Sequence, residues 1–229
     1  MNSTYDIRRR NILTTVVPVE DIVQQYPPLS TLKGIRHEYC RVMRDDCAVK
    51  DMKSSFSTYR KAILKYCKEL YRKSPFIKNT LRCLEKAVSE GIEDSSDFET
   101  TSSVMLLVHL LTKKTSENSL MEMLSEDDDL PNKITRTTYP RVLVIGENIL
   151  KPDRLLLCVE GRQLVDVTSF SLDTVLFTLY ATYYVFSIAY PQDDKDVFLF
   201  IDSVFVGLQH TAINRISLQK FIKALASLK

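Results

Sequence analysis

Residues 141–167 read RVLVIGENILKPDRLLLCVEGRQLVDV and contain two short apolar runs, VLVI and LLLCV, with Gly, Pro and Asp at their boundaries. Short apolar runs bounded in this way are typical of buried β-strands. Glu160 and Gly161 then supply a turn into a third strand over 163–167. We therefore predict a small sheet of about three strands after residue 140.

Helical spacing dominates on both sides of this segment. Apolar residues recur every three or four positions, and serine, proline or glycine stands at several of the expected helix ends. The predicted fold class is α+β and mainly helical. The expected helices cover 35–47, 54–73, 77–90, 104–111, 120–124, 171–190, 197–208 and 217–228.

Charge is distributed unevenly along the chain. Residues 1–90 carry 18 basic and 10 acidic side chains, residues 91–130 carry 2 and 10, and residues 131–229 carry 11 and 9. The charged run SEDDDLP has no apolar period and ends in proline, as linkers often do, and early prolines favour an extended start. We predict an extended segment 1–30, a basic helical region 31–124, an acidic linker 125–138 and an α+β domain 139–229.

The composition is that of an ordinary globular protein. The 229 residues are 45% hydrophobic and 26% charged, and 31 Lys and Arg nearly balance 29 Asp and Glu, for a formal net charge of +2. These values exclude a disordered chain, a collagen-like fibre and a strongly polyanion-seeking protein of the histone type.

Cysteine usage and hydropathy predict where the protein works. Five cysteines without a Cys-x-x-Cys pair indicate thiols in a reducing compartment, so we expect an intracellular protein of the cytoplasm or the nucleus. The first 30 residues show no signal-peptide pattern. Residues 174–192 are uncharged but rich in Thr and Tyr, whose hydroxyl groups need partners in lipid. We expect a buried core helix there and no membrane span.

The C-terminal half carries a pattern of strand, turn and helix residues that extends to YPPL at 26–29. Its parts are YPRVLVIG at 139–146, VEG at 159–161, YVF at 184–186, Tyr190-Pro191 and Phe198. The pattern resembles a multigene family of uncharacterised animal proteins, many of whose fish members are named as similar to a sterile-alpha-motif-containing protein. The resemblance spans residues 25–210 and implies no activity.

Patterns for catalysis, metal binding and cofactor binding are missing from the sequence. It has no Gly-x-Ser-x-Gly elbow, and Cys158 lies mid-strand, away from any loop that a cysteine nucleophile would need. His37, Cys40 and Cys47 lie along one side of the predicted helix 35–47. Structural zinc sites usually use two close pairs of ligands instead. Gly146 lacks the second glycine of a phosphate-binding turn. We predict no enzyme, no metal, no cofactor and no small-molecule substrate.

A basic helix face is the first candidate binding surface. Lys61, Lys65, Lys68 and Arg72 fall within a sector of about 60° on a helix, opposite its apolar side chains. Such a face can follow the phosphate backbone of RNA or DNA. It can equally pair with the acidic segment 91–130 or with an acidic partner, or it can simply be solvated.

The apolar segment 197–206 is the second candidate. It is hydrophobic nearly all round a helix, so it must be covered on more than one side by the domain core or by another chain. We take it as a self-association surface made by Phe198, Phe200, Ile201 and Phe205.

These features predict a non-catalytic protein-interaction or assembly module that self-associates through its apolar C-terminal helices, with itself or another protein as partner. The alternative is a nucleocapsid-like protein that binds nucleic acid without sequence specificity. Ser125 precedes four acidic residues, the context of an acidophilic kinase, so we also predict phosphorylation there.

Overall fold

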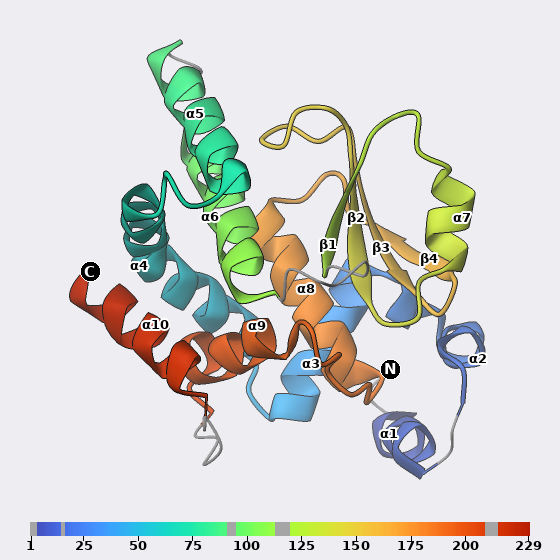
Figure 1. The fold of residues 1–229 in the computed structure, drawn as a ribbon. Helices are drawn as coiled ribbons and strands as arrows, with labels where there is room; N and C mark the ends of the chain where they lie inside the picture. Colours follow the sequence, from blue (N-terminus) through green and yellow to red (C-terminus); the bar gives the residue numbers. More distant parts are fainter. Residues whose placement is uncertain (1–3, 15–16, 91–94, 113–119, 209–214) are drawn as a thin grey trace.

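The structure, a computed structural model, describes residues 4–14, 17–90, 95–112, 120–208 and 215–229 (Figure 1). Among the described residues, every regular element of its first half is a helix. The elements are α1 (Tyr5–Thr14), α2 (Val19–Gln25), the 3₁₀ helix η2 (Pro27–Ser30), α3 (Leu32–Met43), α4 (Ala48–Glu69), α5 (Pro75–Ser89) and α6 (Ser95–Leu111).

The second half holds the strands and the remaining helices. They are β1 (Met121–Leu124), α7 (Leu130–Thr135), β2 (Arg141–Ile145), β3 (Arg154–Val159), β4 (Arg162–Asp166), α8 (Leu172–Val185), α9 (Lys195–Phe200), the π-helix η3 (Ile201–Val206) and α10 (Ile216–Ser227). The predicted α+β class, mainly helical, is confirmed.

The four strands form one mixed sheet in the order β1-β2-β3-β4. The predicted three strands after residue 140 pair antiparallel, with Val142 opposite Leu157 and Leu157 opposite Val165. β1 runs parallel to β2, with Met121 opposite Val142. The predicted short helix over 120–124 is therefore wrong, because the free edge of β2 supplies hydrogen bonds that the local sequence does not reveal.

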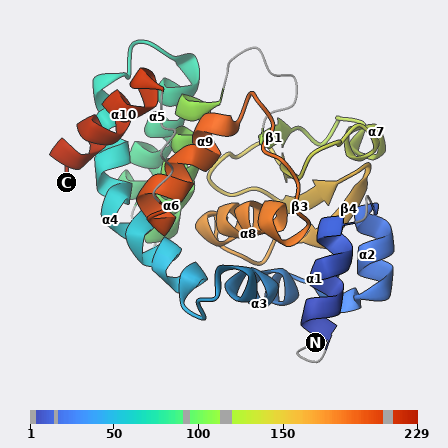
Figure 2. The same cartoon turned by 90° about the horizontal axis from the view of Figure 1, so that it is seen from below.

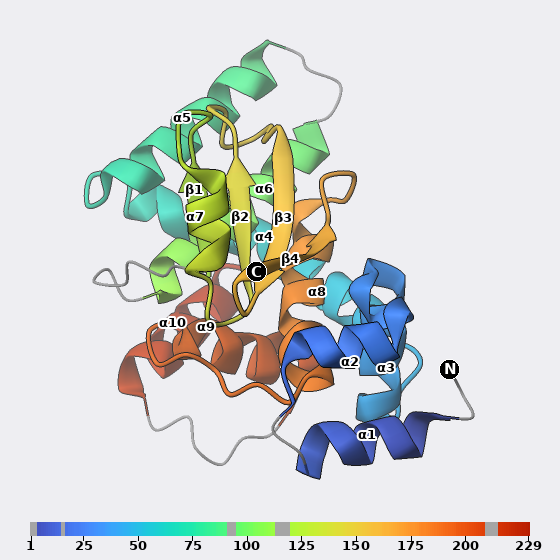
Figure 3. The same ribbon diagram turned by 90° about the vertical axis from the view of Figure 1, so that its right-hand side faces the viewer.

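Helices cover both faces of the sheet (Figures 1 and 3). α8 lies against one face, and 13 of its 14 residues are buried, since α3, α4 and α6 also pack on it. Thr178 and Thr182 donate their hydroxyl hydrogens to carbonyl groups one turn back, which satisfies these groups inside the core. α7 covers the other face through Leu130 and Ile134.

The buried side chains do not follow the predicted division at 125–138. One hydrophobic cluster runs from Ile12 on α1 to Leu225 on α10 and includes strand residues. The predicted acidic linker 125–138 contains α7, whose apolar side chains pack on the sheet. It is part of the fold because two apolar residues one turn apart bury themselves there, although the charges around them obscure this in the sequence.

The predicted extended segment 1–30 is also wrong, because its described residues are largely helical. Pro18 directly precedes α2, and Pro27 opens η2, since proline fits the first positions of a helix. A fully buried ion pair joins α1 to α3: Arg8 Nε donates to Glu38 Oε1 at 2.8 Å and Arg8 Nη2 to Glu38 Oε2 at 2.5 Å. Arg8 is therefore a core residue rather than part of a free basic arm.

The expected core helix over the uncharged run 174–192 is α8, which ends at Val185. Among the described residues, no helix combines the length and the apolar character needed to cross a membrane.

Candidate functional site

α4 is a 22-residue helix that presents one apolar and one basic side. Met52, Phe56, Ile63 and Cys67 face the core with at most 1% of their surface exposed. The helix begins six residues before the predicted start, and it ends at Glu69 because Ser74 and Pro75 begin α5. The periodicity of its apolar side places the opposite side in solvent.

The basic face, defined as Lys61, Lys65, Lys68 and Arg72, lies on this outer side. All four side chains are exposed, and none forms an ion pair with a described residue. Arg72 stands in the turn after α4 rather than on the helix. The nearest acidic residue on the helix is Glu69, which is exposed one turn after Lys65.

The structure also exposes cations on α4 and α10 that the sequence patterns did not single out. Lys50 lies on α4 about 20° from Lys61 in helical projection, which follows only when the helix starts at Ala48. α10 carries exposed Lys220 and Lys223 and no acidic residue.

α10 rests on α4 through aromatic contacts (Figures 1 and 2). The Tyr66 and Phe221 ring centroids are 5.2 Å apart, and the Lys229 ammonium lies 3.4 Å from the Tyr59 ring centroid. In helical projection Tyr59 and Tyr66 stand at least about 100° from Lys61, Lys65 and Lys68, so α10 packs on a different side of α4 from the basic face.

Pairing of the basic face with the acidic segment 91–130 is not seen among the described residues. Glu99 pairs with Arg60, and Glu122 pairs with Lys133 and Arg141. Asp129 accepts a hydrogen bond from the backbone of Asn132 at the start of α7. Glu93, Asp94 and Glu117 lie outside the described residues.

The proposed self-association residues are buried within the chain. Phe198, Phe200 and Ile201 have no exposed surface, and Phe205 has 3%. Phe198 stacks on Tyr190 at 4.3 Å, and Phe205 meets Phe56 at 5.8 Å. These side chains are covered by α4, α8 and the loop before α9, so they offer no surface to a second copy.

Ser125 is exposed, and its hydroxyl donates to Asp128 Oδ2 at 2.9 Å. The backbone N–H of Ser125 reaches the same oxygen at 2.7 Å, and these hydrogen bonds lower the pKa of the Asp128 carboxyl. A phosphate on Ser125 would replace the hydroxyl bond with repulsion from Asp128. Phosphorylation of Ser125 stays a prediction.

The cysteine and histidine residues form no reactive group within the described parts of the chain. Burial raises the pKa of the Cys158 thiol to about 12. Cys40 lies half-buried near His37, whereas Cys47 is exposed at the start of α4. No cluster of three or more metal-ligating side chains occurs among the described residues, which do not include His210.

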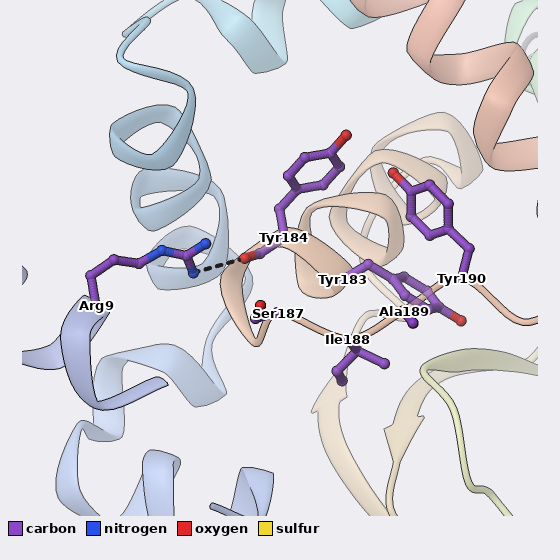
Figure 4. Close-up of a pocket in the computed structure, with 7 residues that line it drawn as sticks. All are labelled: Arg9, Tyr183, Tyr184, Ser187, Ile188, Ala189 and Tyr190. Carbon is purple, nitrogen blue, oxygen red and sulfur yellow. Dashed lines mark hydrogen bonds between the residues drawn. The ribbon is translucent and has the colours of Figure 1, made fainter. Parts of the chain in front are cut away.

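A cavity of about 410 Å³ lies where α8 ends (Figure 4). Arg9 reaches it from α1, and its Nη1 donates to the carbonyl oxygens of Tyr184 and Val185 at 2.9 and 3.1 Å. Arg9 thereby satisfies carbonyl groups that the end of α8 leaves without helical partners. Ser187, Ile188 and Ala189 complete the wall together with three tyrosines.

The polar centre behind this cavity is the carboxylate of Asp202, which is 1% exposed. Its Oδ1 accepts hydrogen bonds from the hydroxyl groups of Tyr180, Tyr184 and Tyr190 at 2.6, 3.1 and 3.3 Å. Burial raises the pKa of Tyr190, and the nearby Asp202 carboxylate raises it further. These hydroxyl groups join α8 and the loop that follows it to η3, which is a structural role.

No protein-family model, curated protein or solved structure matches the chain. The resemblance of residues 25–210 to the multigene family therefore stays a prediction.

Proposed function

We propose that this protein binds single-stranded RNA or DNA through the phosphate backbone, without reading the base sequence. The basic face on α4 makes the contact. The observation that carries the proposal is that all four cations are exposed and unpaired with any described residue. When such cations neutralise phosphates, the counterions condensed on the nucleic acid are released, which favours binding at low salt.

The spacing of the lysines suits a backbone better than a base edge. Lys61 and Lys68 are seven residues apart, which is about 10 Å along the helix, a length on the scale of two or three phosphates of one strand. Lysine ammonium groups contact phosphates as point charges and carry no base specificity.

The proposal replaces self-association as the first choice, because the four side chains expected to mediate it are buried. It describes a non-catalytic protein without a cofactor. It also places the protein in the cytoplasm or the nucleus, where five free thiols stay reduced and nucleic acid is present. An acidic protein partner is the competing occupant of the basic face.

Fluorescence anisotropy with a labelled oligonucleotide of about 20 nucleotides tests the proposal. With four phosphates neutralised, the slope of log K against log salt should be roughly −3. The double variant K65E/K68E should weaken binding and bring the slope to roughly −1.4, because two contacts remain.

The matched control is R10E/R136E, which changes the net charge equally. Both residues are exposed, on α1 and directly after α7, on the side of the molecule away from α4. Equal loss in both variants would show that only net charge matters. Failure of the wild-type protein to bind at about 50 mM salt would refute the proposal and leave an acidic protein as the partner.

A further inference from the structure

A second basic site lies between α3 and the start of α4, where the chain turns at residues 44–47 (Figure 2). It is a cavity of about 280 Å³. Buried Leu32 and Val49 form part of its lining together with half-buried Cys40. Its other lining residues are ionisable: Lys33, Arg36, His37, Asp46 and Lys50.

The cavity carries an excess of positive charge. Three cations, Lys33, Arg36 and Lys50, line the cavity with one carboxylate, Asp46, and the neighbouring Asp45 also acts on the lining Cys40, which leaves a net charge of +1. None of these three cations forms an ion pair with a described residue. The backbone carbonyl oxygen of Asp46 accepts a weak hydrogen bond from the Cys40 thiol, with the oxygen 3.8 Å from Cys40 Sγ.

The cations come from two helices whose positions are set by the core. Thr31 caps α3 by accepting a hydrogen bond from the N–H of Gly34, and Gly34 itself packs against the carbonyl of Pro28, where a side chain would collide. Asp45 Oδ1 accepts from the N–H of Cys47 at 2.8 Å and so fixes the turn into α4. The cavity is therefore preformed rather than assembled by a mobile loop.

Lys50 connects the cavity to the basic face. It lies on the same side of α4 as Lys61, about 16 Å away along the helix axis. The exposed residues between them on this side are Ser54 and Ser57, which carry no charge. A strand that follows the basic face toward the start of α4 therefore ends at the cavity.

We propose that this cavity binds a phosphate monoester, namely the terminal phosphate of the strand held by α4. A monoester carries a charge of about −1.5 to −2 at neutral pH, whereas an internal phosphodiester carries about −1. A site with a net positive charge therefore favours a strand end over the strand interior. The Arg36 guanidinium supplies a planar pair of donors that matches two phosphate oxygens, and the lysines add point charges.

The strand-end assignment rests on the proposed function, but binding of a phosphate monoester does not. The first experiment titrates the protein with uridine 5′-monophosphate and with uridine, followed by backbone amide NMR shifts. The nucleotide should shift residues 33–37 and 46–50, and uridine should not. Absence of nucleotide-specific shifts there would overturn the proposal.

The second experiment measures anisotropy with oligonucleotides that carry a 5′-phosphate, a 3′-phosphate or hydroxyl groups only. The wild-type protein should prefer one phosphorylated end by about tenfold. The variant K33Q/R36Q should lose this preference, while the charge-matched control K78Q/R82Q on the exposed side of α5 should keep it. Equal affinity of the wild-type protein for all three ends would overturn the strand-end assignment.

The two proposals fail in different ways. If K65E/K68E loses the oligonucleotide but still binds uridine 5′-monophosphate, both proposals hold. If the wild-type protein binds the nucleotide but no oligonucleotide, the cavity is a site for a free phosphate monoester and the proposed function is wrong. Circular dichroism of K33Q/R36Q confirms that a lost preference does not come from unfolding.

Discussion

The outer face of α4 is exposed to solvent, whereas the segment 197–206 is buried in the core. Lys61, Lys65 and Lys68 stand in solvent without partners among the described residues. Phe198 and Phe200 are buried completely, each in contact with several other rings. Both regions depart from average composition, one by charge and the other by apolarity, but only the charged one is available to a ligand.

The difference follows from the cost of leaving each type of side chain in the wrong environment. A lysine ammonium loses several kcal/mol of solvation in the interior, so an unpaired lysine stripe remains outside. An apolar side chain gains from any cover, whether it comes from its own chain or from another. Apolarity therefore predicts burial without specifying the covering elements. Here α4, α6 and α10 cover the segment together with rings from α8 and the loop before α9.

The largest effect should come from Phe198→Ala. Phe198 is fully buried between Tyr183, at 4.5 Å, and Tyr190, at 4.3 Å, so its loss leaves a cavity in the core. We expect a loss of about 3–5 kcal/mol in the free energy of unfolding, measured by urea denaturation. If the residue instead served association, the loss would depend on protein concentration, and the oligomeric state would change while the monomer stayed stable.

Glu38→Ala should destabilise by a similar or slightly smaller amount, about 3 kcal/mol or more, because it leaves the buried Arg8 guanidinium unpaired. This change tests whether the N-terminal helices belong to the same cooperative unit as the core. A single urea transition shifted to lower concentration is expected. Two separate transitions would show instead that α1 and α2 unfold on their own.

The buried thiol of Cys67 on α4 should make the stability of the protein depend on alkaline pH. Burial raises the pKa of Cys67 to about 12. The folded state therefore keeps a proton that the unfolded state loses near pH 9, so this contribution to stability is lost as the pH rises from 9 toward 12. Cys67→Ala should reduce the loss of stability between pH 8 and 10.5 by an amount on the order of 1 kcal/mol.

Thiol labelling gives an independent check on the same comparison. Cys47 is exposed and should react at once with a thiol reagent, whereas Cys67 and Cys158 are buried and should react only on unfolding. Rapid labelling of Cys67 in the folded protein would contradict the packing of α4 against the core.

The smallest effect on stability should come from the basic face itself. Lys61→Ala, Lys65→Ala and Lys68→Ala should each change the free energy of unfolding by less than about 0.5 kcal/mol, because exposed side chains without partners add little to stability. Urea denaturation measures this. A loss comparable to that of Phe198→Ala would mean that these residues act in the structure rather than in binding.

Local pattern predicted much of the secondary structure. The apolar runs around Val144 and Leu157 are strands, and the periodic apolar residues of α4 and α10 form the expected helices. The exposure of Lys61, Lys65 and Lys68 also followed from helical periodicity. These features depend on residues close in sequence, whose spacing determines which side of an element is apolar.

Long-range contacts decided the rest. β1 is a strand because it pairs with the edge of β2. α1 packs on α3 because Arg8 forms an ion pair with Glu38, thirty residues later in the chain. The cavity between α3 and α4 exists only because the turn at 44–47 brings Arg36 and Lys50 together. The sequence by itself determined which residues seek water or the interior, whereas the tertiary structure decided which partner each one meets, because partner choice depends on packing between distant segments.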